Sequence, residues 1–496
     1  MDLKSLNYVI FVTLVSILYL GLYRVKYAQK IILAIANSIF ILSVAGLKPF
    51  ILIIALILFS FSCGIGIERM INERRSLAHF LLVFNISVLI LVLCYFKFFL
   101  DSYSIIGDLV VPIGISYYTL TMIAYSHDIF HQKHRAEKNI IDFYTFITFF
   151  PSIIQGPINL YKKISPQLKT PHKPEAQRIY KGIQRSLWGY IKKVVIADRI
   201  GLLVVPILQD ETVSGFYLLF AMILYSFQIY TDFSGGIDVI MGVCEIFDIH
   251  PVENFRSPLV SRSVTEYWQR WHISLGEFME KYIYYPIVLN RKIMKLSKKI
   301  PYNYFKKVFS ATLASVIVFI IVGIWHGTGW NYVIYGGYQA IFVASAVLFS
   351  PLYRKVKHVL RINEVCITWK LFQIIRTFII LTIGRFFIRA NNLSQAVILL
   401  KRTFLNYKWS DIHILFDDTL SNYGLDPKNI FLIYSSIILI VIVDILHERK
   451  IEIRHWLMKQ DIVFRYFVYL CAIFVIIIFG IYGPEFNSST FIYQGF

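Results

Sequence analysis

Long apolar runs recur along the whole chain, separated by short segments rich in charged or turn residues. Most of these runs approach the roughly 17–25 residues that a helix needs to cross the hydrocarbon core of a bilayer. They lie near residues 8–23, 31–47, 50–67, 79–100, 109–130, 194–208, 215–243, 308–325, 331–349, 371–389, 430–446 and 462–483. The pattern predicts an all-α polytopic membrane protein with about 11–12 transmembrane helices.

Two segments interrupt this pattern. Residues 143–158 are apolar but contain Pro151, Gly156 and Pro157, and residues 263–289 combine many aromatic side chains with charged ones. Broken or polar backbone survives at membrane depth only where protein or a water-filled cavity surrounds it. We therefore expect re-entrant or interfacial helices here, lining the place where chemistry would occur.

The composition agrees with a membrane protein. Of 496 residues, 57% are hydrophobic and 16% are charged, and the mean hydropathy is +0.61. A water-soluble domain of this length cannot bury so much apolar surface. The bilayer is therefore the first expected partner.

The net charge of +20 would suggest nucleic acid as the partner of a soluble protein. In this chain the basic residues cluster in short loops, for example Arg74 and Arg75, or Lys298 and Lys299. Such loops face the cytoplasm, which predicts that both termini lie outside. We expect the positive charge to set topology and attract anionic lipid, with no nucleic-acid partner.

One candidate for chemistry ends a strongly apolar run. Residues 323–331 place His326 beside Trp325, among glycines and shortly before Asn331. An apolar setting keeps imidazole neutral, which is the state that a general base needs. Asn331 or a backbone amide would donate a hydrogen bond to an oxyanion. The alternative is that His326 only caps a helix.

A second cluster, residues 266–274, mixes aromatic and ionisable groups. On a helix, Glu266 and Arg270 share one face at i, i+4 spacing, and Trp271, His272 and Ser274 follow directly. A salt-bridged amphipathic helix at the membrane interface would also explain this composition. The segment is therefore a candidate for either the site or its scaffold.

Asp232 and Asp238 lie inside a predicted span, where an isolated charge costs roughly 2.5–3.5 kcal/mol. Such residues usually have a partner. The alternatives to a direct role in catalysis are a structural ion pair with a residue such as Arg256 or Arg270, or a protonated carboxyl group bonded to backbone.

Other chemistries find little support in the sequence. His131 and His134 could suggest a di-iron site, but no second histidine box accompanies them, so we expect no metal. Neither a phosphate-binding glycine loop nor a nucleophile-elbow serine is visible.

The two histidine segments together resemble the paired signatures of the membrane-bound O-acyltransferase (MBOAT) family. Within it, the chain is most similar to the bacterial branch that includes the alginate O-acetylation membrane protein. The resemblance is carried by residues 267–275 and 325–327, and further by residues 151–157, 230–235, 254–259, 386–390 and 491–493.

The resemblance implies a multi-helix fold around a central tunnel or funnel that contains His326 as the catalytic residue. His272 would be the second motif histidine, and the supporting residues would be Asp232, Arg270, Trp271, Ser274, Trp325 and Asn331. It also divides the chain into N-terminal helices (1–108), a catalytic core (109–405) and C-terminal helices (406–496). Near the predicted pocket the chain departs from the common family pattern at 280–281, 288–289 and 338–340.

The resemblance further implies a function. An acyl group, most simply acetyl, would pass from a cytoplasmic thioester (acetyl-CoA or an acyl carrier) to a hydroxyl of an exported envelope polysaccharide. Transfer would be direct or through an extracytoplasmic partner acyltransferase, in the bacterial plasma membrane and with no bound cofactor. Two alternatives stay open: a D-alanyl transferase acting on teichoic acid, and a transporter without catalysis.

Overall fold

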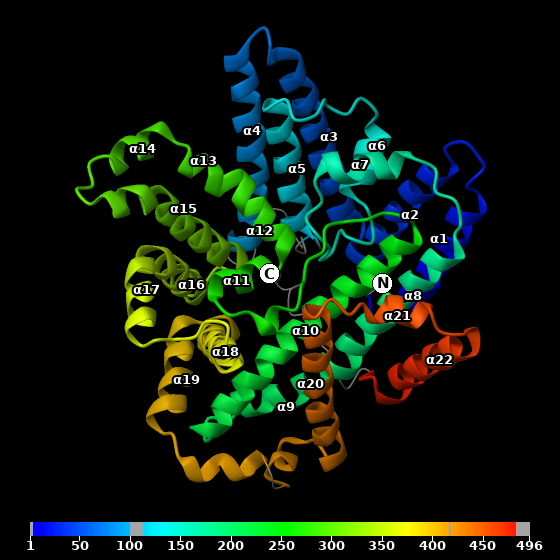
Figure 1. Cartoon of the computed structure of the whole chain (residues 1–496). Coiled ribbons are helices and arrows are strands. Elements are labelled where there is room, and N and C mark those ends of the chain that lie inside the picture. The colour runs from blue at the N-terminus through cyan, green and yellow to red at the C-terminus, as the bar shows by residue number, and fades with distance from the viewer. Residues whose placement is uncertain (1–2, 100–111, 113, 416–417, 483–496) are drawn as a thin grey trace.

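The computed structural model describes residues 3–99, 112, 114–415 and 418–482. Within them the chain forms helices and no strands, apart from an isolated antiparallel bridge between Phe255 and Trp271. The prediction of an all-α polytopic membrane protein is confirmed (Figure 1).

The first half of the chain contains long helices followed by shorter ones. They are α1 (Leu6–Gly21), α2 (Ala28–Ala45), α3 (Leu47–Met70), α4 (Arg75–Cys94), the π-helix η1 (Tyr95–Phe99), α5 (Ile115–Phe130), α6 (Ile140–Ile147), α7 (Tyr161–Lys169), α8 (Ala176–Tyr190), the π-helix η2 (Ile191–Ala197), α9 (Asp198–Gln209) and α10 (Phe216–Ile246).

The second half begins with short elements and ends with long helices. They are the 3₁₀-helix η3 (Pro258–Val260), α11 (Val264–Arg270), α12 (Ile273–Met279), the π-helix η4 (Glu280–Tyr284), α13 (Tyr285–Val288), α14 (Arg291–Ser297), α15 (Asn303–His326), α16 (Trp330–Leu348), α17 (Ser350–Val359), α18 (Ile367–Arg389), α19 (Leu393–Leu405), the 3₁₀-helices η5 (Trp409–Leu415) and η6 (Asp418–Tyr423), α20 (Pro427–Glu448), α21 (Ile453–Met458) and α22 (Ile462–Phe479).

Fewer helices can span a bilayer than the sequence suggested. In the described part of the chain, eight helices are long and apolar enough, or nine if α16 and α17, which meet at a 67° bend, form one span. The run at 194–208 accounts for part of the difference. It folds as η2 and α9, whose side chains are largely buried in protein rather than exposed to lipid.

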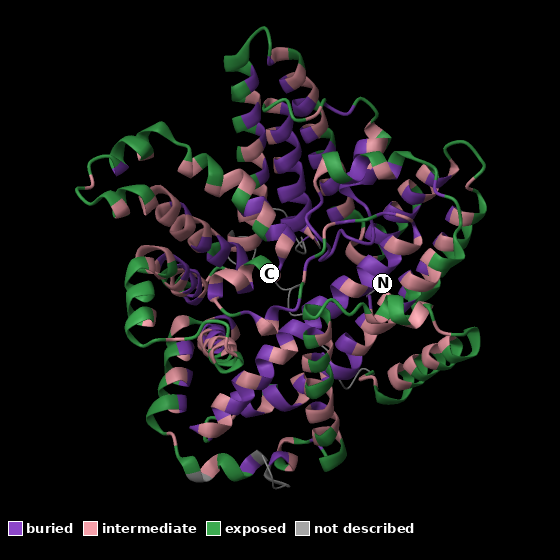
Figure 2. Ribbon diagram, in the orientation of Figure 1, coloured by how far each residue is buried: buried purple, intermediate pink, exposed green. Residues whose placement is uncertain are grey.

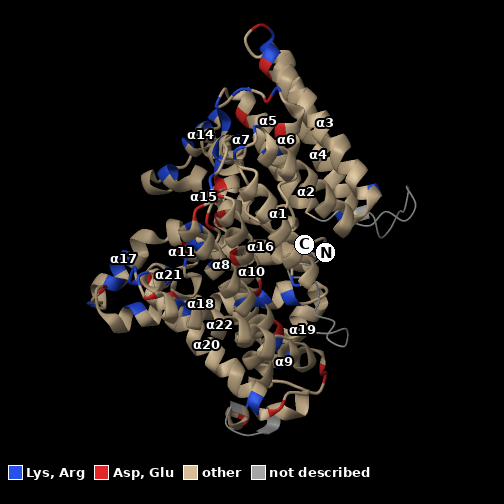
Figure 3. Ribbon diagram, turned by 90° about the vertical axis from the view of Figure 1, so that its right-hand side faces the viewer, with Lys and Arg blue, Asp and Glu red and all other residues tan. Residues whose placement is uncertain are grey.

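Burial identifies the centre of the molecule. Helix α10 and helix α5 are mostly buried, whereas none of the residues of α22 is buried (Figure 2). Charged residues gather on short helices such as α14 and α17, and the long helices carry few of them (Figure 3). This distribution fits an apolar belt in contact with lipid around a polar-lined interior.

Both segments predicted to be broken are broken. Helix α6 ends at Ile147, and the non-helical backbone that follows is buried. The Asn37 side chain replaces helix hydrogen bonds there: it donates to Thr148 Oγ1 (3.1 Å) and accepts from the Phe150 amide (2.9 Å). Residues 263–289 divide into α11, α12, η4 and α13.

A close helix pair presents His326. Helices α15 and α16 are joined by a short turn and approach each other at Gly323 and Gly336. A Cβ on Gly323 would lie 2.4 Å from the Tyr332 carbonyl oxygen, and one on Gly336 would lie 2.3 Å from that of Phe319. No larger side chain fits at this crossing without moving the backbone.

Candidate active site

His326 is the last residue of α15 and is 3% exposed. The backbone leaves the helix in an extended conformation at Gly327, where the Tyr332 ring fills the space that a Cβ would need. The imidazole lies edge-to-face against Trp325, with centroids 4.9 Å apart, and near the ring of Tyr335 at 6.4 Å. An imidazole is therefore fixed among aromatic rings at the end of a membrane helix.

His272 is held just before α12 in a left-handed backbone conformation, with φ at +49°. For a residue with a Cβ this conformation costs roughly 1–2 kcal/mol. Asn254 holds the turn: its carbonyl accepts from the Ile273 amide (3.1 Å) and its side chain accepts from the Ser274 amide (2.9 Å). Burial lowers the pKa of His272 to about 3, so its imidazole is neutral at physiological pH.

The indole of Trp325 brings the two histidines together. Its ring centroid lies 6.0 Å from that of His272 and 4.9 Å from that of His326. Tyr117 completes the group, stacking on His272 at 6.3 Å and meeting Trp325 at 6.1 Å. The buried indole N–H of Trp325 has no acceptor among the described residues. The indole that contacts both imidazoles thus has a buried N–H with no acceptor among the described residues.

Asp232 has a partner, but not one that the sequence suggested. Its carboxylate is paired with the buried ammonium of Lys193, which also binds Asp198 at 2.8 Å. The expected partners, Arg256 and Arg270, do not form this pair. Asp232 therefore belongs to a buried charge network between α10 and the π-helix η2.

Asp238 is also paired with neighbours that precede it in the chain. Arg185 Nε donates to it at 2.9 Å, and Lys192 donates to its other carboxylate oxygen. Asp238 thereby joins α10 to both α8 and η2.

Arg270 joins α11 to α20. It binds Glu266 at 2.7 Å, which confirms the i, i+4 pair expected from the sequence, and it forms a forked pair with Glu448 at 2.7 and 3.0 Å. With these bonds made, Arg270 serves to position the segment that carries His272.

Trp271 and Ser274 pack the same segment into the protein. The Trp271 indole stacks on Tyr267 at 5.4 Å and meets Phe255 edge-to-face at 5.0 Å. The Ser274 hydroxyl accepts from the Ile158 amide at 3.0 Å. It thus ties α12 to the broken segment after α6.

Asn331 positions the end of α18. Its amide nitrogen donates to the carbonyl oxygens of Phe387 (2.9 Å) and Ala390 (3.0 Å), so both of its N–H hydrogens are in use. In this arrangement the side chain has no hydrogen left for the oxyanion that the sequence analysis assigned to it.

Lys97 is a site residue that the sequence analysis missed. It lies in η1, donates to the Trp325 carbonyl oxygen, and places its ammonium 5.2 Å from the centroid of the Trp325 ring. It is close enough to His326 to interact with it electrostatically. The available signal was a single lysine in the apolar run at 79–100, because intramembrane charges mark functional positions.

Arg385 is a second residue that was missed. It is 4% exposed, and its Nη2 donates to the Tyr267 hydroxyl at 3.2 Å. Its Nη1 has no hydrogen-bond partner among the described residues. The guanidinium also lies near Tyr335, the neighbour of His326. A buried cation with a free donor suits a site where negative charge develops.

Two histidines outside this group were also candidate metal ligands. Among the described residues, no three His, Cys, Asp or Glu side chains are arranged to hold a metal ion. His131 and His134 hydrogen-bond to nearby backbone carbonyl oxygens, each at 2.9 Å.

A family model and several bacterial relatives match the chain. A model of the membrane-bound O-acyltransferase family matches residues 71–388, which contain both histidine motifs. The chain is 27% identical to the probable alginate O-acetylase AlgI of Azotobacter vinelandii, over 78% of this chain and 75% of that one.

Two further relatives come from other bacteria. The peptidoglycan O-acetyltransferase of Helicobacter pylori is 28% identical over 73% of this chain and 72% of its own length. The teichoic acid D-alanyltransferase of Bacillus subtilis is 29% identical over 43% of this chain and 53% of its own.

Of the motifs that resemble the family, residues 491–493 lie outside the described residues. The chain belongs to the MBOAT family and is a multi-pass membrane acyltransferase.

Proposed function

We propose that this acyltransferase moves an acyl group, most simply acetyl, from a thioester donor to a hydroxyl of an exported cell-envelope polysaccharide, with His326 as the catalytic base. The observation that carries the proposal is the grouping of His326 and His272 around the unused indole N–H of Trp325. Such a group combines a proton acceptor with a donor for an oxyanion.

The proposed reaction needs no nucleotide. His326 takes the proton of the acceptor hydroxyl while its oxygen attacks the thioester carbonyl. The carbon–oxygen bond forms, the carbon–sulfur bond breaks, and the proton passes from His326 to the departing thiolate. In a two-step variant His326 attacks the carbonyl itself and the hydroxyl then takes the acyl group from the imidazole.

Three groups are available to stabilise the negative charge of the tetrahedral intermediate. The Trp325 indole, whose ring contacts both histidines, has an unused N–H, Arg385 has a free Nη1, and Lys97 donates to the Trp325 carbonyl oxygen. Donors held in place before the reaction stabilise the developing charge without reorganising. We assign His272 to positioning Trp325, since it is buried against that indole.

The donor would reach the site from the cytoplasm. The short helices α14 and α17 carry basic side chains and connect longer apolar helices, and such basic connections favour the cytoplasmic side of the membrane. Their positive charges would attract the phosphates of coenzyme A or an acidic carrier protein. The acceptor would be reached from the opposite side, directly or through an extracytoplasmic acyltransferase. The names of two relatives, an alginate O-acetylase and a peptidoglycan O-acetyltransferase, support a polysaccharide acceptor.

D-alanyl transfer is the closest competing function. A D-alanyltransferase relative matches 43% of the chain, and the two O-acetylating relatives named above match 73–78% of it. Ester-linked acetate and ester-linked alanine in the envelope are chemically distinct, so analysis of released acids and amino acids separates the two functions. A transporter would leave the thioester intact.

A substitution at His326 tests the proposal in cells. With His326→Gln, envelope ester content should fall to that of a strain lacking the protein, while the amount of membrane-inserted protein stays the same. His358→Gln, an exposed position on α17, is the matched control and should change nothing. Normal ester content in the His326→Gln strain would refute the proposal.

A further inference from the structure

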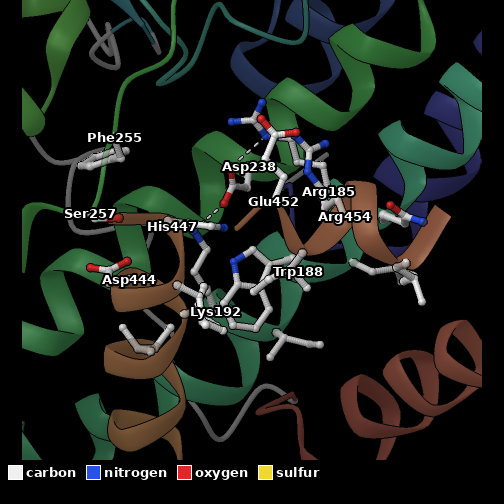
Figure 4. A pocket seen from close by; sticks show the side chains of 18 of the residues that line it. Arg185, Trp188, Lys192, Asp238, Phe255, Ser257, Asp444, His447, Glu452 and Arg454 are labelled. Carbon is white, nitrogen blue, oxygen red and sulfur yellow. Dashed lines mark hydrogen bonds and ion pairs between the residues drawn. The ribbon is translucent and has the colours of Figure 1, made fainter. Parts of the chain in front are cut away.

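A large cavity is lined by residues other than the group around His326. It has a volume of about 1020 Å³ and is enclosed by α8 and α10 at the back, α20 and α22 at the sides and α21 (Figure 4). This is at the upper end of the roughly 300–1,000 Å³ typical of ligand pockets. None of the proposed catalytic residues lines it. Tyr230 and Phe255 form its inner wall and meet Trp271 on their far side.

One end of the cavity is apolar and continuous with the lipid-facing surface. Leu439 and Ile442 of α20 and Val468 and Ala472 of α22 line it, and these two helices are largely exposed along their length. Leu439 and Ile442 are themselves exposed hydrophobic residues. Acyl chains of the bilayer can therefore enter this end.

The other end is polar and lies near the end of α20. Asp444 is 3% exposed. It comes four residues before Glu448, the last residue of α20, and this separation corresponds to about 6 Å along the helix axis. The Tyr230 hydroxyl donates to Asp444 Oδ1 at 2.9 Å. The Leu259 amide lies near the same carboxyl group, but no described residue completes a hydrogen bond to Oδ2. A buried carboxylate oxygen is thus left for a ligand that donates hydrogen bonds.

Cations at the rim complement this carboxylate. Arg185, Lys192 and Arg454 already bind carboxylates within the protein. Lys181, Arg256 and Lys450 also line the cavity but form no ion pair with a carboxylate in the described residues. Their positive charges are available to bind phosphate oxygens.

We propose that this cavity binds a membrane phospholipid with a primary amine in its headgroup, of the phosphatidylethanolamine type. The ammonium group donates to Asp444 Oδ2, the phosphate lies against the rim cations, and the acyl chains lie along α20 and α22. An apolar slot beside one buried acceptor and several cations matches this headgroup better than a purely anionic one. The bound lipid fills the cavity beside the wall that supports Trp271, and so stabilises the segment that carries His272.

Lipid binding to the purified, delipidated full-length protein tests the proposal by native mass spectrometry. Phosphatidylethanolamine, phosphatidylcholine and phosphatidylglycerol with the same acyl chains are the probes. The first should bind about tenfold more tightly than the second, which keeps the phosphate but cannot donate from its quaternary nitrogen, as expected for one charge-assisted hydrogen bond. Equal affinities, or tighter binding of phosphatidylglycerol, would overturn the proposal.

Two variants place the site. Asp444→Asn keeps an acceptor for the Tyr230 hydroxyl and should remove the preference for phosphatidylethanolamine, whereas Lys428→Gln at the opposite end of α20 should retain it.

A second experiment places the acyl chains. Phosphatidylethanolamine with brominated chains should quench the fluorescence of Trp188, which lines the cavity, and the quenching is measured as the difference from Trp188→Phe. An unchanged preference in Asp444→Asn, or no difference in quenching, would overturn the assignment. His326→Ala should bind lipid normally, so this result does not depend on the proposed acyl transfer.

Discussion

The indole ring of Trp325 meets the imidazole of His326 edge-to-face, with centroids 4.9 Å apart and ring planes at 73°. The same indole meets His272 at 6.0 Å. Two motifs separated by more than fifty residues of sequence are joined through one side chain, and this relationship makes the roles of the surrounding residues testable.

The indole N–H of Trp325 is expected to act on the transition state. Trp325→Phe keeps an aromatic ring beside the two histidines but removes the indole donor together with part of the ring, so the rate of acyl transfer should fall about 10²–10³-fold, with little change in donor KM. Trp330→Phe, at a position that is 73% exposed, is the control. Steady-state thioester consumption by the purified proteins measures both. A Trp325→Phe enzyme as fast as the parent would rule out this role.

Arg385 is expected to contribute through its charge. Arg385→Gln should lower kcat by about 10²-fold, because a buried cation near the reaction centre no longer opposes the developing negative charge. Arg385→Lys should recover part of the loss, and Arg449→Gln, at an exposed position, should have no effect. If Arg385 were only structural, the Gln and Lys variants would lose thermal stability together and kcat per folded molecule would not change.

The buried network of Lys193 gives a prediction about stability. Because Lys193 binds both Asp232 and Asp198, Lys193→Met removes the cation that the two buried carboxylates share, although Lys4 still lies 3.8 Å from Asp198, and should destabilise the fold by about 3–5 kcal/mol. Asp232→Asn leaves Lys193 paired with Asp198 and should cost less. Thermal unfolding in detergent compares the variants. A larger loss in Asp232→Asn would show that the network is not organised around the lysine.

The buried His272 predicts a dependence of stability on pH. Its pKa is lowered to about 3 in the folded protein, below the value of about 6.5 for an exposed histidine, so the unfolded state binds the extra proton. The unfolding free energy is unaffected by this group above about pH 6.5 and decreases as the pH falls toward 3. At pH 5 the decrease amounts to about 2 kcal/mol. The decrease in unfolding free energy between pH 7 and pH 5 should be smaller in His272→Gln by that amount. Equal pH dependence in the two proteins would contradict the burial of a neutral ring.

Much of the fold could be predicted because its signals are local. The apolar run at 308–325 matches α15, and the prolines and glycine of residues 151–157 mark a real break in helical structure. The pair of Glu266 and Arg270 followed from helical spacing alone. The run at 194–208 was assigned to the bilayer because hydropathy does not distinguish burial in protein from exposure to lipid.

The details of the site depend on contacts between distant parts of the chain, and these leave no periodic signal. The partner of Asp232 is Lys193, 39 residues earlier, rather than the nearer arginines. Lys97 and Arg385 are far apart in the sequence, in η1 and α18, and nothing in their local sequence points to His326. Lys97 is the one Lys or Arg in its predicted span, but Arg385 shares its helix with Lys370, Arg376 and Arg389, so its position alone did not distinguish it.

Single-turnover transfer from a radiolabelled acyl thioester to acceptor, using purified and folded His326→Gln protein, tests the central claim most directly. The loss of a general base predicts a rate about 10²–10⁴-fold below that of the parent protein, with His358→Gln unaffected. A His326→Gln protein that transfers the acyl group within a few-fold of the parent rate would show that this imidazole does not carry the reaction.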